Sequence, residues 1–172
     1  YNGEIYNYVE LREGLIKKGH RFHSLSDSEV ILHAYEEWGT GCLQRFNGMW
    51  AFALWDERTQ QLFCARDRFG IKPFYYTEIH GSFLFASEIK ALLSHPDVGL
   101  TPDDETLGTY LAWGVQDHSA RTMFGGILQL EPAHALIVTK DGPHAPCRYW
   151  DVTINSALRS DAHDHDKKDR FL

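Results

Sequence analysis

Apolar residues recur at helical spacing near the start of the chain. Tyr8, Leu11 and Leu15 lie three to four positions apart, and Gly19 follows as a residue suited to ending a helix. The few residues before this segment have the pattern of a strand end that turns into the helix. The pattern therefore predicts a short strand and then a helix that closes at Gly19.

A second helix is predicted over residues 27–38. Residues 26–29 (SDSE) have the pattern of a capping box. In this motif the Ser26 hydroxyl accepts from the third amide of the helix, and the Glu29 carboxylate reaches back to the amide of Ser26. Gly39 is expected to end the helix. Its buried face should hold five apolar residues: Val30, Ile31, Ala34, Tyr35 and Trp38.

From residue 49 the pattern changes to short apolar runs that are typical of strands. The predicted strands are 49–55, 61–66, 73–77 and 82–86, with turns at 56–59 and 79–81. The links are too short for parallel crossovers, so the four strands are predicted to form an antiparallel meander.

The rest of the chain adds helices and a late hairpin. Ser87 is expected to cap a helix that runs to Leu93, and a longer helix should start at Pro102 or Asp103 and end at Trp113. Residues 134–140 and 147–151 should pair through an Asp-Gly turn at 141–142. Two strand-rich stretches separated by helices predict an α+β fold, with two antiparallel sheets covered by helices.

Composition agrees with one packed domain. The chain has 172 residues, 43% of them apolar and 13% aromatic, which is enough for a core and atypical of disorder. The 17 basic residues are scattered and the net charge is −7, so no nucleic-acid partner is predicted. No apolar run reaches the roughly 18 residues of a membrane span, so no membrane partner is predicted either.

The last segment differs from the rest. Residues 1–152 are predicted to form the domain, and residues 153–172 to form a polar linker toward a further domain. His163 and His165 lie among three aspartates there, a composition that raises the question of a metal site. A polar run does not hold ligands in place, so no metal is predicted.

Three cysteines, Cys42, Cys64 and Cys147, are far apart in the sequence and odd in number. They form neither a zinc motif nor a disulfide framework, and they favour a reducing, cytoplasmic location. Cys64 lies in an apolar, strand-like run, and all three are expected to be core residues without an activating base.

Asn2 and Gly3 allow two interpretations. Asn-Gly is a common turn dipeptide, but its side-chain amide and backbone N–H can also stabilise an oxyanion. Asp27 is similarly either a helix cap or a fixed, charged acceptor for an ammonium group.

Longer matches favour the second interpretation in both cases. Residues 2–7 (NGEIYN), Leu11 and residues 26–30 (SDSEV) resemble the glutamine-binding signature of class II, N-terminal-nucleophile glutamine amidotransferases. The resemblance implies that Asn2 and Gly3 are the oxyanion donors. It implies that Glu4 and Asp27 bind the α-amino group of L-glutamine.

A second set of segments narrows the family. It is similar to the glutaminase domain of asparagine synthetases: residues 47–56, 65–76, 85–92, 122–134 and 149–151. The resemblance covers about residues 1–151 and implies an N-terminal-nucleophile αββα sandwich. Because the chain starts at Tyr1, within the signature, the sandwich is expected to lack its first strands.

The resemblance also implies a mechanism. A cysteine at the mature N-terminus attacks glutamine with its own α-amine as the base, and the ammonia released reaches a synthetase domain that uses ATP and Mg²⁺ to convert aspartate into asparagine. The chain has no such cysteine and no phosphate loop, so by itself it is expected to be inactive and to need no cofactor. Its expected partners are L-glutamine and the synthetase domain, and a homodimer stays open.

Three other functions stay open. The partner domain could amidate another carboxylate. The domain could be non-catalytic, as in β-lactam-forming synthetases, although the intact residues 2–4 and Asp27 argue against this. It could also be a plain interaction module.

Residues 66–68 (RDR) beside Gly70 and Lys72 raise the question of a phosphate site. No phosphate loop follows them, so an ion-paired structural corner that supports the pocket wall is predicted instead.

Overall fold

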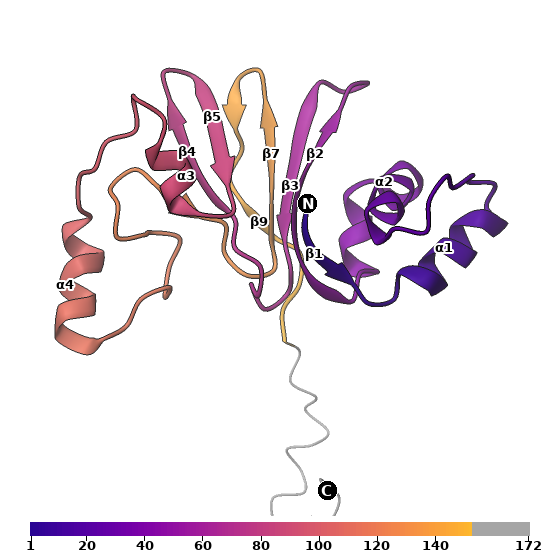
Figure 1. The fold of residues 1–172 in the computed structure, drawn as a ribbon, viewed down its shortest axis with the longest axis horizontal. Helices are drawn as coiled ribbons and strands as arrows, with labels where there is room; N and C mark the ends of the chain where they lie inside the picture. Colours follow the sequence, from indigo (N-terminus) through magenta and orange to yellow (C-terminus); the bar gives the residue numbers. More distant parts are fainter. Residues whose placement is uncertain (153–172) are drawn as a thin grey trace, which may run out of the picture.

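The computed structural model describes residues 1–152 as four layers, in the order helices, sheet, sheet, helices (Figure 1). The first sheet has the strand order β1-β2-β3-β7-β8, and β9 also pairs with β7. Its strands are β1 (Asn2–Ile5), β2 (Gly48–Asp56), β3 (Gln61–Arg66), β7 (His134–Thr139), β8 (Gly142–Pro143) and β9 (Cys147–Arg148). The second sheet has the order β5-β4-β6. Its strands are β4 (Tyr75–Ile79), β5 (Ser82–Ala86) and β6 (Leu128–Gln129).

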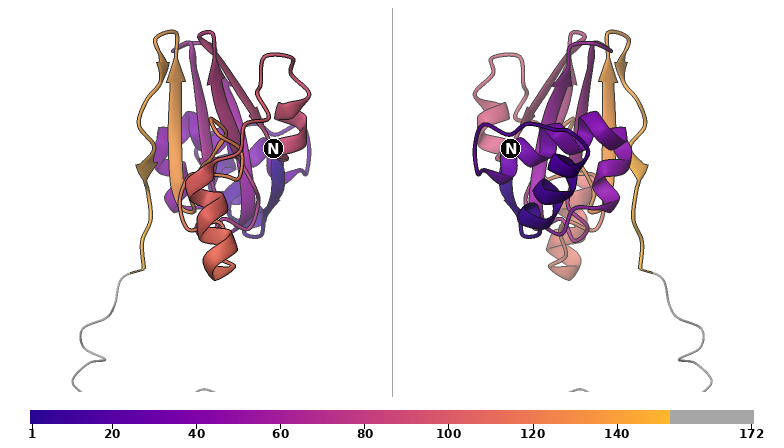
Figure 2. Two further views of the ribbon diagram at one scale, coloured as in Figure 1. Left: turned by 90° about the vertical axis from the view of Figure 1, so that its left-hand side faces the viewer. Right: turned by 90° about the vertical axis from the view of Figure 1, so that its right-hand side faces the viewer.

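Helices cover the outer face of each sheet (Figure 2). The first sheet carries α1 (Tyr8–Lys17), α2 (Asp27–Trp38) and the 3₁₀ helix η1 (Gly39–Gln44). The second sheet carries α3 (Ile89–Leu93), and α4 (Asp104–Trp113) lies at the same end of the molecule. Every strand pair is antiparallel, so the predicted α+β class with two antiparallel sheets is confirmed.

The side chains of β2 explain why one sheet has two apolar faces. Trp50, Phe52 and Leu54 point to the helix side, where they pack with buried residues of α1 and α2. Ala51 and Ala53 point to the second sheet. Large residues therefore fill the helix–sheet core, and small ones let the two sheets approach each other.

The predicted meander is wrong at its middle link. β2 pairs with β3, and β4 pairs with β5, but β3 pairs with β7 and β4 with β6. The segment between β3 and β4 carries the chain from the first sheet to the second. The two hairpins therefore lie in different layers, and β4 starts at Tyr75, two residues later than predicted.

The late hairpin is confirmed, in two pieces. β7 pairs first with β8 and then with β9, and the residues between these two strands form no ladder. Pro143 and Pro146 interrupt this returning arm, since proline has no N–H to donate. The two-residue strand β6 had no predicted counterpart.

Two predicted helix starts need correction. α2 has the predicted bounds and Gly39 ends it, but the Ser26 hydroxyl accepts from the amide of Ser28 at 3.1 Å. Glu29 does not reach back to Ser26; its carboxylate accepts from the amides of His23 and Ser24, both at 2.7 Å. The loop before the helix thus curls over its first turn. α3 starts at Ile89 and has no side-chain cap, so the predicted cap at Ser87 is wrong.

Within residues 1–152, no helix combines the length and the hydropathy needed to cross a membrane. The predicted linker at 153–172, with His163 and His165, lies outside the described residues.

Candidate functional site

Close backbone contact between β1 and β2 sets the position of the predicted oxyanion residues. Gly3 pairs with Trp50 and has φ = 141°, a value that residues with a side chain rarely adopt. A Cβ atom on Gly3 would lie 2.1 Å from the carbonyl oxygen of Met49. Gly48 meets β1 in the same way, with the carbonyl oxygen of Glu4 2.1 Å from its would-be Cβ. The two glycines let the strands approach closely here.

Asp27 connects α2 to β1. It is the first residue of α2, where the positive end of the helix dipole favours a carboxylate. Its Oδ2 accepts from the backbone N–H of Ile5 at 3.0 Å and from the Tyr1 hydroxyl at 2.5 Å. Its Oδ1 has only a long contact, 3.5 Å from the Ser26 hydroxyl. One oxygen thus holds the carboxylate in place, and the other is available to a ligand.

Tyr1 was missed as a site residue. Partial burial raises the pKa of its hydroxyl, and the hydrogen bond to Asp27 and the charge of that carboxylate raise it further. The phenol therefore stays protonated and donates to Asp27. The sequence signal was the four-residue spacing of Tyr1 and Ile5, since side chains four positions apart on an extended chain lie on the same side, and Ile5 packs in the core with α2.

The structure brings two of the four predicted residues into one pocket. Glu4 and Asp27 line a cavity of about 430 Å³, together with Ile5, Tyr6, Tyr8, Leu25 and Ser26. Asn2 lines a different, smaller cavity of about 140 Å³ between β1, β2 and β5. Ser87, which the sequence suggested only as a helix cap, lines that second cavity. The predicted oxyanion donor Asn2 and the predicted ammonium acceptors thus line separate cavities, and Tyr1, which lines the cavity of Asn2, donates to Asp27.

The corner after β3 supports the partner strand of β1. Asp67 is fully buried, and its carboxylate accepts from the amides of Trp50, Phe69, Ile71 and Lys72 at 3.0–3.1 Å. Its own N–H donates to the carbonyl of Trp50 at 2.8 Å. Because Trp50 pairs with Gly3 between β2 and β1, the bonds from Asp67 to Trp50 help to fix the position of β2 relative to Gly3.

The predicted ion pairing at this corner is wrong. The Arg66 guanidinium donates to the carbonyls of Gly70, Lys72 and Leu130, each at 2.7 Å. Burial lowers the pKa of Arg66. Among the described residues, neither Arg66 nor Arg68 forms an ion pair with Asp67. Backbone carbonyls accept from the Arg66 guanidinium, and backbone amides donate to the Asp67 carboxylate. The corner is therefore structural, and these groups are not available to bind a phosphate.

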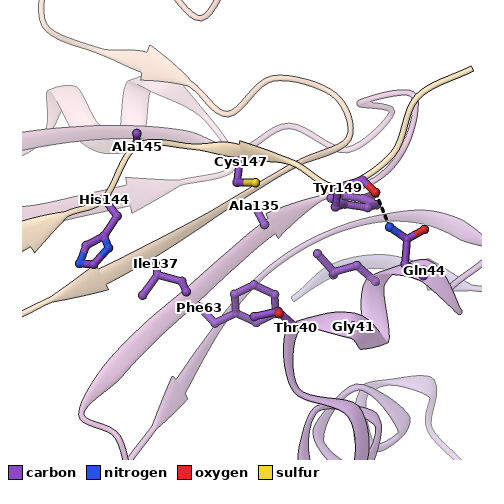
Figure 3. A pocket seen from close by; sticks show the side chains of 11 residues that line it. Thr40, Gly41, Gln44, Phe63, Ala135, Ile137, His144, Ala145, Cys147 and Tyr149 are labelled. Carbon is purple, nitrogen blue, oxygen red and sulfur yellow. Dashed lines mark hydrogen bonds between the residues drawn. The ribbon is translucent and has the colours of Figure 1, made fainter.

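A further cavity lies away from these residues (Figure 3). It measures about 450 Å³ and opens between η1 and the β7–β9 arm. Phe63, Ala135 and Ile137 form its apolar wall, and a hydrogen bond from Gln44 to the carbonyl of Tyr149 closes one end. Its lining has no convergent set of charged groups that could perform chemistry.

The three cysteines differ in their surroundings. Cys42 and Cys64 are buried, and burial raises the pKa of both thiols to about 12. Both therefore stay protonated at neutral pH and are poor nucleophiles. Cys147 is exposed, contrary to the expectation of a core residue.

Comparisons with known proteins agree with this architecture. Residues 1–150 match the family of the glutamine amidotransferase domain. The chain is 48% identical over 152 residues to asparagine synthetase [glutamine-hydrolyzing] 3 of Bacillus subtilis, covering 88% of this chain and 25% of that protein. It is 35% identical to amidase chyE of Penicillium rubens over 163 residues, covering 94% of this chain and 23% of that protein. The chain thus spans about a quarter of the length of these relatives.

A solved structure shares the fold. The glutamine phosphoribosylpyrophosphate amidotransferase of B. subtilis, complexed with ADP and GMP, superposes with a TM-score of 0.61 at 21% identity, covering 90% of this chain and 29% of that one. The predicted N-terminal-nucleophile type of sandwich is therefore confirmed at the level of fold. With a family match over residues 1–150, the chain belongs to the glutamine amidotransferase domain family.

Proposed function

We propose that this domain hydrolyses glutamine and supplies ammonia for asparagine synthesis. The observation that carries the proposal is the pocket shared by Glu4 and Asp27, in which one Asp27 oxygen is held by β1 and the other is available. A free amino acid carries an ammonium group, and two carboxylates at one pocket suit it. The 48% identity to a glutamine-hydrolysing asparagine synthetase supports glutamine as the ligand.

Asn2 and Gly3 are proposed to form the oxyanion hole of this site. As the carbonyl of glutamine is attacked, its oxygen becomes negative, and an amide N–H on each residue can stabilise that charge. One such donor is typically worth about 3 kcal/mol of barrier. The rigid pairing of Gly3 with Trp50 fits this role, since preorganised donors need no rearrangement during the reaction.

None of the three thiols of this chain is the proposed nucleophile. Cys42 and Cys64 are buried and protonated, and Cys147 lines the large apolar cavity rather than the pocket of Asp27. The attacking cysteine of the family bears its own α-amine, which no internal residue has. We therefore expect the 172-residue chain by itself to hydrolyse no glutamine.

The synthetase step is proposed to belong to another domain. That step needs ATP and Mg²⁺, and the residues described here do not fit a nucleotide: the hydrogen-bonding groups of Arg66 and Asp67 are used by the backbone. The partners of this domain are then L-glutamine and the ATP-dependent domain. Three unpaired cysteines agree with a reducing compartment such as the cytoplasm.

One comparison supports a second class of substrate that accepts the ammonia. The similarity to a protein named amidase chyE shows that relatives of this domain have names other than asparagine synthetase. The acceptor could then be a carboxylate other than aspartate. The glutamine pocket would be the same in both cases.

The test uses the full-length protein and the isosteric variant Asp27→Asn. Asparagine formation is measured with glutamine and, separately, with ammonium salt as the nitrogen source. We expect kcat/KM for glutamine to fall at least about 100-fold, because a charged acceptor is lost, while the ammonia-dependent rate is unchanged. Asp97→Asn, at an exposed aspartate after α3, is the matched control.

Two results would contradict the proposal. Unchanged glutamine kinetics in Asp27→Asn would remove Asp27 from the site. A wild-type protein that uses ammonia but never glutamine would show the non-catalytic alternative. Product formation only with acceptors other than aspartate would favour the second acceptor class.

A further inference from the structure

Two histidines and three glutamates form a cluster where the loop after α1 meets α2. His20 lies in the loop after α1, and His33 and Glu36 lie on α2. Both histidines are largely buried, with side chains 15% and 18% exposed. The cluster does not line the pocket of Asp27, and nothing in the glutamine reaction requires it.

Three ligand atoms of this cluster have the spacing of a tetrahedral metal site. The Nδ1 atoms of His20 and His33 lie 3.2 Å apart. Oε2 of Glu36 lies 2.9 Å from Nδ1 of His33 and 3.6 Å from Nδ1 of His20. In a tetrahedral zinc site with bonds of about 2.05 Å, ligand atoms lie about 3.3 Å from one another. The three distances scatter around that value.

The outer partners also fit. Nε2 of His20 lies 3.1 Å from the carboxylate of Glu37, and Nε2 of His33 lies 3.6 Å from that of Glu29. A carboxylate on the second ring nitrogen is the usual arrangement for a metal-binding histidine, because it orients the ring and fixes the tautomer. His20 has this hydrogen bond, and the Glu29 carboxylate lies beside Nε2 of His33, just beyond hydrogen-bond distance.

The two outer carboxylates are themselves held in place. Glu29 accepts from the amides of His23 and Ser24 at 2.7 Å and from the Ser24 hydroxyl at 2.6 Å. Glu37 is paired with the ammonium of Lys18 at 2.6 Å. These bonds orient the outer partners without any metal, so the cluster is largely preorganised.

Charge balance favours a divalent cation. Three carboxylates, those of Glu29, Glu36 and Glu37, surround the two imidazoles, and among the described ion pairs of the cluster only Lys18 brings a permanent positive charge. Two negative charges are left, which one divalent ion neutralises. The Nδ1 atoms of the two imidazoles face each other and the Glu36 carboxylate, so one ion between them could bind all three groups.

We propose that His20, His33 and Glu36 bind Zn²⁺, or a similar divalent transition metal, with water as the fourth ligand. Two imidazoles and one carboxylate are a ligand set that zinc accepts. The ion would join the loop after α1 to the middle of α2. That loop leads directly to Ser26 and Asp27, so the metal would brace the segment that positions Asp27.

The test measures metal binding to the full-length protein after chelator treatment. Zn²⁺ is titrated against a chromophoric competitor, and Co²⁺ is added separately because a tetrahedral site gives it intense visible absorption. The wild type should bind one ion more per chain than His20→Ala or His33→Ala. Each variant should weaken this site by more than about 100-fold, since outer partners alone account for 10–100-fold.

A gentler variant covers the case in which the histidine variants do not fold. Glu37→Gln keeps all three ligands and removes only the charge behind His20, so it should weaken Zn²⁺ about 10-fold. His118→Ala, at an exposed histidine outside the cluster, should bind as the wild type does. The double variant His163→Ala/His165→Ala should also keep the ion, because it retains the three proposed ligands.

Three outcomes would overturn the proposal. These are equal stoichiometry and affinity in wild type, His20→Ala and His33→Ala; loss of the ion only in the His163/His165 double variant; and no binding to the wild type tighter than millimolar. Binding is measured without substrates, so a failure here leaves the proposal on glutamine hydrolysis standing.

Discussion

Gly3 shows how one residue without a side chain controls this site. Its φ of 141° and its contact with Met49 and Trp50 leave no room for a Cβ atom. The neighbouring Asn2 takes its position from the same strand pairing. A change at Gly3 therefore moves both proposed oxyanion donors.

Gly3→Ala should destabilise the domain and abolish glutamine turnover. The added methyl would lie 2.1 Å from a carbonyl oxygen, so β1 has to leave its register, and we expect a loss of at least about 2 kcal/mol in the free energy of unfolding. Denaturant unfolding measures the loss of stability, and glutaminase assays of the full-length protein measure the loss of turnover.

Gly14→Ala is the control for that substitution. Gly14 lies inside α1 with open space around its would-be Cβ, so alanine should stabilise the domain by about 0.5–1 kcal/mol. A Gly3→Ala protein as stable and active as the wild type would show that β1 can be repositioned.

At the scale of elements, the corner between β3 and β4 matters most. It takes the chain from one sheet to the other, and a single carboxylate, Asp67, accepts four backbone amides there. Each of these N–H groups would be unsatisfied without it, and unsatisfied buried donors are costly. The corner thus depends on a charge that no basic side chain within residues 1–152 pairs with.

Asp67→Asn should lower the free energy of unfolding by about 3 kcal/mol. The amide of asparagine has one acceptor oxygen, and its NH₂ group would face N–H donors, so two of the four amides lose their partner. Urea unfolding gives the change in midpoint, with the slope expected to be unchanged.

Asp97→Asn serves as the surface control at this scale. It should stay within about 0.5 kcal/mol of the wild type. If the two variants are equally stable, water or a local rearrangement satisfies the amides of the corner, and Asp67 is not what holds it.

At the scale of the whole molecule, two of the three cores contain groups that resist ionisation. Cys42 lies in the core between the first sheet and its helices, and Cys64 lies between the two sheets. Tyr76 and Tyr149 are also partly or fully shielded, and burial raises the pKa of both. Each group holds its proton more tightly in the folded chain than in the unfolded chain.

Stability should therefore fall in alkaline solution. Both thiols have a pKa of about 12 when folded and an ordinary value near 8.5 when unfolded, so their contribution is complete below pH 8.5 and is lost as the pH rises toward 12. Each thiol should steepen the decline by up to about 1.4 kcal/mol per pH unit. Urea unfolding between pH 7.5 and 10 measures it.

Cysteine variants separate this effect from general alkaline damage. Cys64→Ala should show a shallower decline with pH than the wild type, whereas Cys147→Ser, at an exposed thiol, should decline as the wild type does. Equal slopes in the two variants would mean that the buried thiol ionises without unfolding.

Local signals predicted much of this molecule. Hydrophobic spacing and turn residues correctly predicted helices α2 and α4 and strands β3 and β5. These signals work because helix periodicity and turn chemistry act over a few neighbouring positions. The resemblance in residues 2–7 and 26–30 selected Asn2, Gly3, Glu4 and Asp27, and it pointed to the family that the comparison with residues 1–150 then showed.

The sequence by itself determined most of the elements, the α+β class and the family, since each depends on local pattern or on a continuous motif. Only the tertiary structure decided that β3 pairs with β7, that Asp67 serves backbone amides instead of arginines, and that Tyr1 donates to Asp27. The tertiary structure alone also brings His20, His33 and Glu36 together. All depend on contacts between residues far apart in the chain, which no local periodicity encodes.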